Sequence, residues 1–366
     1  MKIVIAPDKF KGTLPSSKVI AALSMGILSK VPNLEIKEIT MADGGEGSAE
    51  IIAKHIHAKK KNINTLDAME RPISAEYHIN EENIAVFDLA SASGLYRVKD
   101  EIRNLNKLNT RGTGIIIKKL IPICRELIIC LGGSATNDFA LGAAFETGYY
   151  FSDQHKNRLS PYPENLSKIK EIHNEEISPF LKGVTFRCLC DVENILLGPQ
   201  GAVNTFSKQK GATPEQLISL EEGMEQFCDL LETHSNREIK NIPRSGSAGG
   251  FGGGARGFFN AELESGFEYI AMITNLEEQI KTADLIITGE GKTDATSFQG
   301  KVVGGIIKLA TKYNKKTVVV CGQTNLSPSN EYEVYSLSKT YGIDKSLTEP
   351  EDCLVDTGKR IGERLK

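Results

Sequence analysis

The sequence predicts an α/β protein whose main domain is a doubly wound parallel sheet. Short apolar runs recur along the chain, each ends in glycine, hydroxyl or carboxylate residues, and a helical pattern follows most of them. The length of 366 residues, with 40% hydrophobic and 25% charged residues, allows two domains and a large core. Ligands of open α/β sheets bind outside the carboxyl ends of the strands. We therefore expect the polar turns to converge on one cleft.

Predicted strands and helices alternate at both ends of the chain. At the ends, the expected strands are 3–6, 36–40, 285–288, 317–321 and 334–337, and the expected helices are 16–29, 48–57, 302–312 and one from about residue 350. Two further strands are expected in the middle of the chain, at 127–131 and 186–189. Between the ends, residues 63–89 alternate in the manner of antiparallel strands. We expect a discontinuous α/β domain from residues 1–60 and 271–366, an inserted domain from 61–270, and an active site in the cleft between them.

The residues at the predicted strand ends are the candidates for chemistry. Carboxylates suit Mg²⁺, which binds a few protein oxygens and keeps its other positions for water and phosphate oxygens. The predicted magnesium ligands are Asp8, Asp43 and Glu290, and the candidate bases are Asp191 and Asp294. Lysines neutralise the charge of a transferring phosphoryl group, and the lysines in these turns are Lys9, Lys11 and Lys301.

Two further turns predict anion binding without a familiar motif. Gly291-Lys292-Thr293 copies the end of a P-loop, but Ile286 stands where its first glycine is required, and an acidic turn at 289–291 followed by a helix start is expected instead. Gly132-Gly133-Ser134 resembles a nucleophile elbow, but Thr136 breaks G-x-S-x-G. We expect hydroxyl, amide and backbone donors there. The donors are Ser134, Asn137 and Ser247 with the amides of Gly44, Gly45, Gly132, Gly133, Gly249, Gly289 and Gly291.

The segment 245–257 is unusually rich in glycine. It contains G-x-G-x-x-G at Gly252, Gly254 and Gly257, but no buried strand precedes it, so a dinucleotide fingerprint and a dehydrogenase are disfavoured. Glycine permits close backbone approach and motion. We expect a ligand-contacting loop or hinge over 246–257, with slower hydrogen exchange when ligands bind.

Charge and composition limit the partners. With 44 basic and 47 acidic residues the net charge is −3, which disfavours nucleic acid. No apolar stretch is long enough to predict a membrane span or a signal sequence, so a cytoplasmic location is expected. None of the seven cysteines forms C-x-x-C, which favours buried, reduced thiols.

The ordered motifs resemble the type I glycerate kinase family over essentially the whole chain. They are 6–14 (APDKFKGTL), 42–47 (ADGGEG), 132–138 (GGSATND), 190–192 (CDV), 198–202 (GPQGA), 209–214 (QKGATP) and 289–291 (GEG) with Asp294 and 300–301 (GK). The resemblance implies ATP-dependent phosphorylation of D-glycerate, a flavodoxin-like domain, and an inserted domain similar to the restriction-endonuclease fold. It favours 2-phosphoglycerate as the product.

The resulting mechanism is in-line transfer of the γ-phosphoryl group of ATP to a glycerate hydroxyl. Asp191 or Asp294 is expected to orient and deprotonate that hydroxyl. Asp8, Asp43 and Glu290 are expected to help hold Mg²⁺, while Lys9, Lys11 and Lys301 contact phosphates or the glycerate carboxylate. Asp8 is also expected to take part in binding substrate or nucleotide. Two alternatives stay open: phosphorylation of the 3-hydroxyl, and a non-catalytic protein that binds nucleotide as a regulator.

Overall fold

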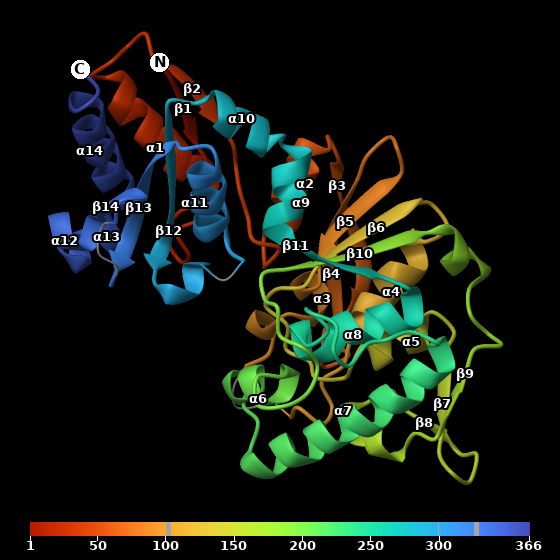
Figure 1. Ribbon diagram of the computed structural model, residues 1–366. Coiled ribbons are helices and arrows are strands. Elements are labelled where there is room, and N and C mark those ends of the chain that lie inside the picture. The colour runs from red at the N-terminus through yellow and green to blue at the C-terminus, as the bar shows by residue number, and fades with distance from the viewer. Residues whose placement is uncertain (100–103, 299, 326–328) are drawn as a thin grey trace. The chain divides into compact units, whose positions relative to one another are not determined.

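The computed structural model describes residues 1–99, 104–298, 300–325 and 329–366 (Figure 1). The chain divides into two compact units: unit 1 is Met1–Asp43 with Phe267–Lys366, and unit 2 is Gly44–Gly266. The expected domains were 1–60 with 271–366, and 61–270. They differ from these units most at the first boundary, which lies after Asp43 and not after residue 60. Helix α2 (Ser48–His55) packs on the strands β4 (Pro72–Ile79) and β5 (Ile84–Asp88), and therefore belongs with unit 2.

Unit 1 contains a parallel sheet with the strand order of flavodoxin. Its strands are β1 (Lys2–Ile5), β2 (Glu35–Glu38), β12 (Leu285–Thr293), β13 (Lys316–Thr324) and β14 (Tyr332–Ser336). In the described part of the chain they form a five-stranded sheet in the order β14-β13-β12-β1-β2, with every pair parallel. Numbered within unit 1 this order is 2-1-3-4-5, so the flavodoxin-like prediction is confirmed. The strand order reverses between β1 and β12, which is where such sheets bind ligands.

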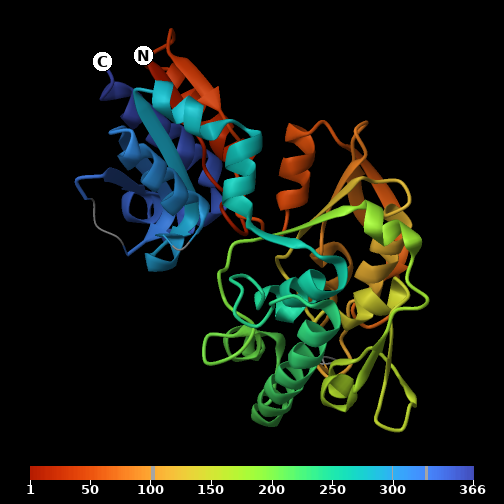
Figure 2. The same ribbon diagram turned by 45° about the vertical axis from the view of Figure 1, so that its right-hand side comes forward.

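Helices cover both faces of the unit 1 sheet (Figures 1 and 2). On one face, α1 (Ser16–Leu28) and α14 (Pro350–Glu363) pack against each other and against Val318 and Val320. On the other, α11 (Val302–Lys312) packs against Val319. The alternation of these valines follows from the period of two in a strand. The remaining helices of this unit are α10 (Leu276–Thr282), α12 (Leu337–Tyr341), α13 (Ile343–Thr348) and α9 (Gly266–Ile273), which begins at the boundary.

Unit 2 contains a mixed sheet. Its strands are β3 (Lys59–Leu66), β4, β5, β6 (Glu126–Cys130), β10 (Thr185–Cys190) and β11 (Glu262–Ser265), in the order β11-β10-β6-β5-β4-β3. The pairs β3-β4 and β4-β5 are antiparallel, which confirms the pattern expected for 63–89, and the other pairs are parallel. A smaller sheet has the order β8-β7-β9, with β7 (Tyr150–Ser152), β8 (Arg158–Leu159) and β9 (Glu171–His173).

The helices of unit 2 lie on both faces of its mixed sheet. Figures 1 and 2 show α2 on one side and α4, α5 and α8 on the other, over the main core. The bounds are α3 (Ala90–Ser93), α4 (Arg111–Leu120), α5 (Leu141–Glu146), α6 (Ala202–Phe206), α7 (Pro214–Ser235) and α8 (Ser247–Phe259). Helix α7 begins where Thr213 and Gln216 form a reciprocal capping box, which satisfies backbone N–H groups at the helix start.

The acidic segment after residue 288 is not a turn. Strand β12 continues through Gly289, Glu290 and Gly291 to Thr293, paired with β13, and a 3₁₀ turn at Ala295–Phe298 follows. The glycines permit this pairing: a Cβ on Gly289 would lie 1.8 Å from the Val320 carbonyl oxygen. The expected acidic turn was wrong because the glycines here make room for a neighbouring strand instead of breaking the strand.

The glycine-rich segment is not a loop. It forms the buried helix α8, in which Ala248, Gly249 and Gly250 have left-handed backbone angles before regular helix resumes. Its glycines face close neighbours: a Cβ on Gly249 would lie 1.9 Å from the Thr136 carbonyl oxygen, and one on Gly254 would lie 2.1 Å from that of Phe139. The expected loop over 246–257 was therefore wrong, since most of these residues lie in a helix whose glycines allow close packing. The expected hinge and ligand contact stay predictions.

The state of the cysteines and the lack of a membrane-spanning helix were both expected from the sequence. All seven cysteines lie among them, each free and buried, as expected for reduced thiols. No helix in this part of the chain is both long and apolar enough to span a bilayer.

Candidate functional site

The carboxyl edge of the unit 1 sheet brings together residues distant in sequence. Asp8 follows β1 and donates its backbone N–H to the Gly289 carbonyl of β12 at 2.8 Å. The Thr288 hydroxyl donates to the Ala6 carbonyl at 3.0 Å. A Cβ on Gly291 would lie 3.0 Å from the backbone nitrogen of Lys11, so glycine lets the loop after β1 approach β12. These contacts place Asp8 beside Glu290 at the point where the strand order reverses.

Three carboxylates of this edge act on one another. Burial, followed by the negative charges of Asp43 and Glu290, raises the pKa of Asp8 to about 8, although Lys9 opposes the rise. Burial also raises the pKa of Glu290, opposed by a hydrogen bond from Ser297 and by the charge of Lys301. The buried Glu290 Oε1 has no hydrogen-bond partner among the described residues. Burial and the neighbouring carboxylates thus both disfavour the charged forms of Asp8 and Glu290.

The predicted cations of unit 1 lie around this cluster. Lys301 is the N-cap of α11, where a helix start favours anions, and its charge acts on Glu290. The backbone N–H of Lys9 donates to Asp8 Oδ1 at 2.7 Å, which fixes the carboxylate by its own loop. Asp294 follows β12; its backbone N–H donates to the Ser297 hydroxyl at 3.0 Å, and its carboxylate lies 3.9 Å from Lys292 Nζ.

The carboxylates do not form a closed metal site. In the ranges that the structure describes, no group of three or more His, Cys, Asp or Glu side chains is arranged to hold a metal ion. The unpartnered Glu290 Oε1 and the raised pKa of Asp8 nevertheless fit a site that gains from a nearby cation. The magnesium site of Asp8, Asp43 and Glu290 therefore stays a prediction.

In unit 2 several predicted turns meet one another. A Cβ on Gly132 would lie 2.2 Å from the backbone nitrogen of Glu46 and 2.5 Å from Gly45, so the turn after β6 packs on the start of the unit. Gly44 adopts a φ of +90°, and a Cβ there would lie 2.9 Å from the Cys190 nitrogen, at the end of β10. The structure thus brings the ends of β6 and β10 to the turn 44–46. Asp191 follows directly on Cys190.

A buried lysine lies at the centre of the turn after β6. Lys210, in the 3₁₀ turn η5 (Lys208–Lys210), donates from Nζ to Ser134 Oγ at 2.9 Å, the Thr136 carbonyl at 2.7 Å and Asn137 Oδ1 at 3.4 Å. Only 3% of its surface is exposed. Burial lowers its pKa to about 7, although the charge of Asp138 opposes this. Ser134 and Asn137 therefore bind a cation of the protein itself.

The remaining predicted residues of unit 2 support this turn from α8. The Ser247 hydroxyl donates to the Arg244 carbonyl at 2.6 Å, and Gly249 packs on Thr136 and Asn137. Asp138, at the end of this turn, is buried and accepts hydrogen bonds from the Thr110 N–H and hydroxyl at 2.7 Å each and from the Gly142 N–H at 3.1 Å. Ser247 and Gly249 are buried packing and hydrogen-bonding residues, and their predicted contact with ligand stays untested.

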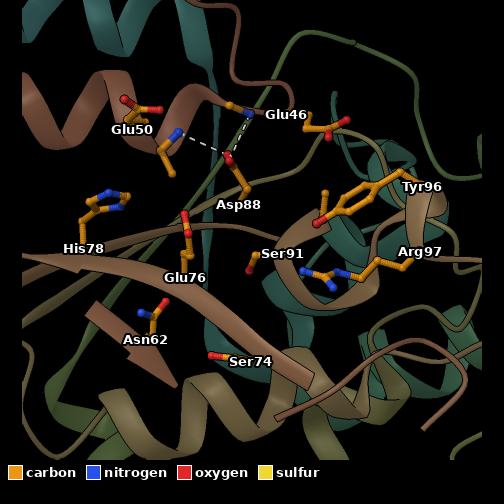
Figure 3. Close-up of a pocket in the computed structure, with 13 residues that line it drawn as sticks. Glu46, Glu50, Asn62, Ser74, Glu76, His78, Asp88, Ser91, Tyr96 and Arg97 are labelled. Atoms are coloured by element: carbon orange, nitrogen blue, oxygen red, sulfur yellow. Dashed lines mark hydrogen bonds between the residues drawn. The ribbon is translucent and has the colours of Figure 1, made fainter. Parts of the chain in front are cut away.

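Unit 2 also contains a cavity of about 530 Å³ (Figure 3). In this close-up, Asp88 accepts hydrogen bonds from the N–H groups of Gly47 and Ala49 at 3.0 and 3.1 Å, and so caps α2. Arg97 Nε and Ser91 Oγ are buried and have no partner among the described residues. The lining of the cavity is mostly polar, and none of the predicted site residues lines it.

No role was predicted from the sequence for Lys210, Asp138 or Arg97. Lys210 lies inside the motif 209–214 and Asp138 inside the motif 132–138, so these motifs could have marked both residues as candidates. Burial of a lysine cannot be read from a polar segment such as 207–210, where the neighbours Lys208 and Gln209 are exposed. Arg97 stands in no recognised motif.

Comparisons with known proteins agree with this architecture. A glycerate kinase from Halalkalibacterium halodurans is 34% identical over 366 residues, which cover 99% of this chain and 94% of that protein. A glycerate 2-kinase from Escherichia coli is 33% identical over 324 residues, 88% of this chain and 85% of that protein. A crystal structure of a protein from Salmonella typhimurium LT2, named as a candidate glycerate kinase 2, matches with a TM-score of 0.86 at 28% identity, covering 100% of this chain and 98% of that one.

A family model described as the glycerate kinase family matches residues 3–366. The match includes both segments of unit 1 and all of unit 2. Together with relatives more than 30% identical over most of their length, it shows that the chain belongs to the glycerate kinase family.

Proposed function

We propose that this protein is an ATP-dependent kinase that transfers the γ-phosphoryl group to D-glycerate and releases 2-phosphoglycerate and ADP. The observation that carries the proposal is the carboxylate cluster of Asp8, Asp43 and Glu290 at the strand-order reversal of a flavodoxin-like sheet. The name of the Escherichia coli relative, glycerate 2-kinase, favours phosphorylation of the 2-hydroxyl.

Mg²⁺ and ATP are the expected cofactors. Asp8, Asp43 and Glu290 would hold Mg²⁺, which when bound would neutralise charge on the phosphates. The donor set fits because all its oxygens come from carboxylates, and one of them, Glu290 Oε1, has no partner in the described chain. Lys9, Lys11 and Lys301 would bind phosphate or carboxylate oxygens beside this cluster, and the start of α11 would add N–H donors.

The remaining residues orient the acceptor. Either Asp191 of unit 2 or Asp294 of unit 1 would accept the proton of the attacking hydroxyl. Ser134 would donate a hydrogen bond to an anionic oxygen of a substrate. Phosphoryl transfer depends mostly on positioning and on neutralising charge, so carboxylates, lysines and N–H donors suffice without a nucleophilic side chain.

The experiment that tests the proposal is an ADP-release assay with ATP and Mg²⁺ against a panel of small hydroxy acids. We expect turnover with D-glycerate and a 2-phosphoglycerate signal in phosphorus NMR of the product. A dominant 3-phosphoglycerate signal would keep the kinase and change the regiochemistry. Nucleotide binding without turnover of any hydroxy acid would favour the regulator instead.

A direct test of the cation site uses stability in place of activity. Mg²⁺ should raise the melting temperature of the protein at pH 8, because a ligand that binds only the folded state stabilises it. Glu290→Gln should reduce this increase, whereas Glu331→Gln, an exposed residue of the same unit, should leave it unchanged. Equal increases in both variants would remove Glu290 from the magnesium site.

A further inference from the structure

The hydrogen bonds of Lys210 account for all of its donors. A lysine ammonium has three N–H donors and no acceptor. In the structure Nζ contacts three oxygens, Ser134 Oγ, the Thr136 carbonyl and Asn137 Oδ1, at 2.7 to 3.4 Å. None of these oxygens is charged, and the side chain is almost fully buried. Lys210 has no remaining donor for a ligand, so any effect on substrate must pass through a neighbour.

That neighbour is Ser134. A serine hydroxyl has one proton and two lone pairs. When Ser134 Oγ accepts a hydrogen bond from the Lys210 ammonium, its own proton must point elsewhere. Among the described residues the Ser134 hydroxyl donates to no atom; Ser134 itself is 7% exposed, and the adjacent Gly133 is exposed with a φ of +67°. The Glu46 carboxylate faces the same turn, since a Cβ on Gly133 would lie 2.9 Å from Glu46 Oε2, so a ligand that reaches Ser134 approaches beside this carboxylate. The Ser134 proton is therefore available to an acceptor that comes from outside the chain.

The neutral form of Lys210 reverses this hydrogen bond. An amine has two N–H donors and one lone pair, so it can still donate to the Thr136 and Asn137 oxygens while accepting the Ser134 proton. The two forms differ in where the Ser134 proton points, and they interconvert near neutral pH because burial lowers the pKa of Lys210 to about 7. Asp138 is the charged group that acts on Lys210, and burial raises the pKa of Asp138 itself. The other lysine of η5, Lys208, is exposed.

We propose that Lys210 is a positioning residue whose ammonium form directs the Ser134 hydroxyl proton toward an anionic oxygen of the bound substrate. The inference rests on the function proposed above and names one anion contact of that function. The anion is either the carboxylate of glycerate or a phosphate of ATP. In both cases binding of the anion and protonation of Lys210 favour each other.

The test is the pH dependence of ligand binding. Calorimetry from pH 6 to 9 measures the dissociation constants of D-glycerate and, separately, of a non-hydrolysable ATP analogue with Mg²⁺. For the ligand that contacts Ser134, affinity should fall by up to roughly tenfold per pH unit above the pKa of Lys210, since one proton is linked to binding. The ligand that shows this dependence identifies the anion.

Variants separate positioning from simple structural support. Ser134→Ala should bind that ligand more weakly at pH 6 and lose this fall in affinity above pH 7, and Ser134→Thr, which keeps the hydroxyl, should restore it. Lys208→Met is the matched control and should behave as the unchanged protein. An equal pH dependence in Ser134→Ala, or no pH dependence for either ligand in the unchanged protein, would overturn the inference.

Direct titration tests the inference with the buried Lys210 left in place, so it does not depend on whether a Lys210 variant folds. With ¹³C in the lysine ε-carbons, NMR of the unliganded protein should show one lysine titrating near pH 7, shifted upward when the ligand binds. If every lysine titrates above pH 9 the inference fails, whatever the kinase assay gives. Conversely, binding linked to Lys210 without any phosphorylation of glycerate would sustain the inference and reject only the kinase.

Discussion

The polar turns of the two units differ in the charge that they bury: carboxylates in unit 1 and a lysine ammonium in unit 2. In unit 1 Asp8, Asp43 and Glu290 gather carboxylates at one sheet edge, and burial, with a smaller contribution from the neighbouring carboxylates, raises the pKa values of Asp8 and Glu290. In unit 2 the buried ammonium of Lys210 donates to three neutral oxygens, and burial lowers its pKa although the charge of Asp138 opposes this. The first arrangement gains from an added cation. The second is already satisfied, and can influence a ligand only by orienting its own hydrogen bonds.

The largest expected effect is the loss of turnover when the general base is replaced, and it shows which unit supplies that base. Asp191 belongs to unit 2 and Asp294 to unit 1. Replacing the base by Asn should lower kcat by roughly 10²- to 10⁴-fold, because general base catalysis contributes that much, while circular dichroism and melting temperature stay unchanged. Normal turnover in both folded variants would reject both residues as the base.

Gly249→Ala tests whether the unit 2 turn is rigid. The new methyl group would meet the Thr136 carbonyl, and Gly249 has a φ of +69° that alanine disfavours. We expect the free energy of unfolding to fall by about 2 to 4 kcal/mol, from overpacking and backbone strain together. Gly183→Ala has open space around its Cβ and should change it by less than about 0.5 kcal/mol. Similar free energies of unfolding of the two variants in urea titrations would show that the turn can rearrange to accept the methyl group.

Lys301→Ala tests the role of positive charge in unit 1. Lys301 lies at the start of α11 and acts on Glu290, whereas Lys308 of the same helix is exposed. Removing a phosphate contact should lower kcat/KM for ATP about tenfold or more, as expected for a charge-assisted hydrogen bond. Lys308→Ala should leave the steady-state constants unchanged. If the two substitutions have equal effects, position 301 is only a solvated charge.

Per pH unit, the smallest effect is the opposite response of the two units to pH. The fold keeps a proton on Asp8 up to about pH 8, but the unfolded chain loses it near the ordinary pKa of 3.8, so this group makes stability fall as pH rises from 4 to 8. Lys210 loses its proton near pH 7 in the fold and near a pKa of 10.5 in the unfolded chain, so stability rises over that range.

Each contribution amounts to at most roughly 1.4 kcal/mol per pH unit. Asp8→Asn should remove the fall between pH 4 and 8, and Lys210→Met should remove the rise between pH 7 and 10.5. Denaturant titrations at four pH values, each compared with the unchanged protein, give both slopes. Slopes of the same sign would contradict the electrostatic difference between the units.

Much of the fold follows from apolar runs and their flanking residues. The helix predicted over 302–312 has those bounds in the structure, and the predicted runs at 3–6, 127–131 and 317–321 overlap strands β1, β6 and β13. What periodicity cannot show is why a glycine is there. In β12 and α8 the glycines make room for neighbouring backbone atoms, and only the tertiary contacts of Gly289 and Gly254 reveal this.

The candidate site was predictable to a similar degree. The rule that ligands bind at the carboxyl ends of parallel strands identified Asp8 and Glu290, since both follow directly from the apolar runs. It could not assign Lys210, because a lysine is ordinarily exposed and its burial depends on packing of the turn 132–138 against η5.

The division of unit 1 into two distant segments has a consequence for the order of folding. All of unit 2 lies between strands β1 and β12 in the sequence, so the central pairing of this sheet has a very long sequence separation. Contacts of this kind form late, because a long loop must close before they are gained. During synthesis the first 43 residues emerge before their partners exist, whereas unit 2 is continuous and can complete its core first. The apolar faces of β1 and α1 therefore lack their partners β12 and α14 until that later segment has been synthesised, and stay exposed to chaperones and to aggregation for that time.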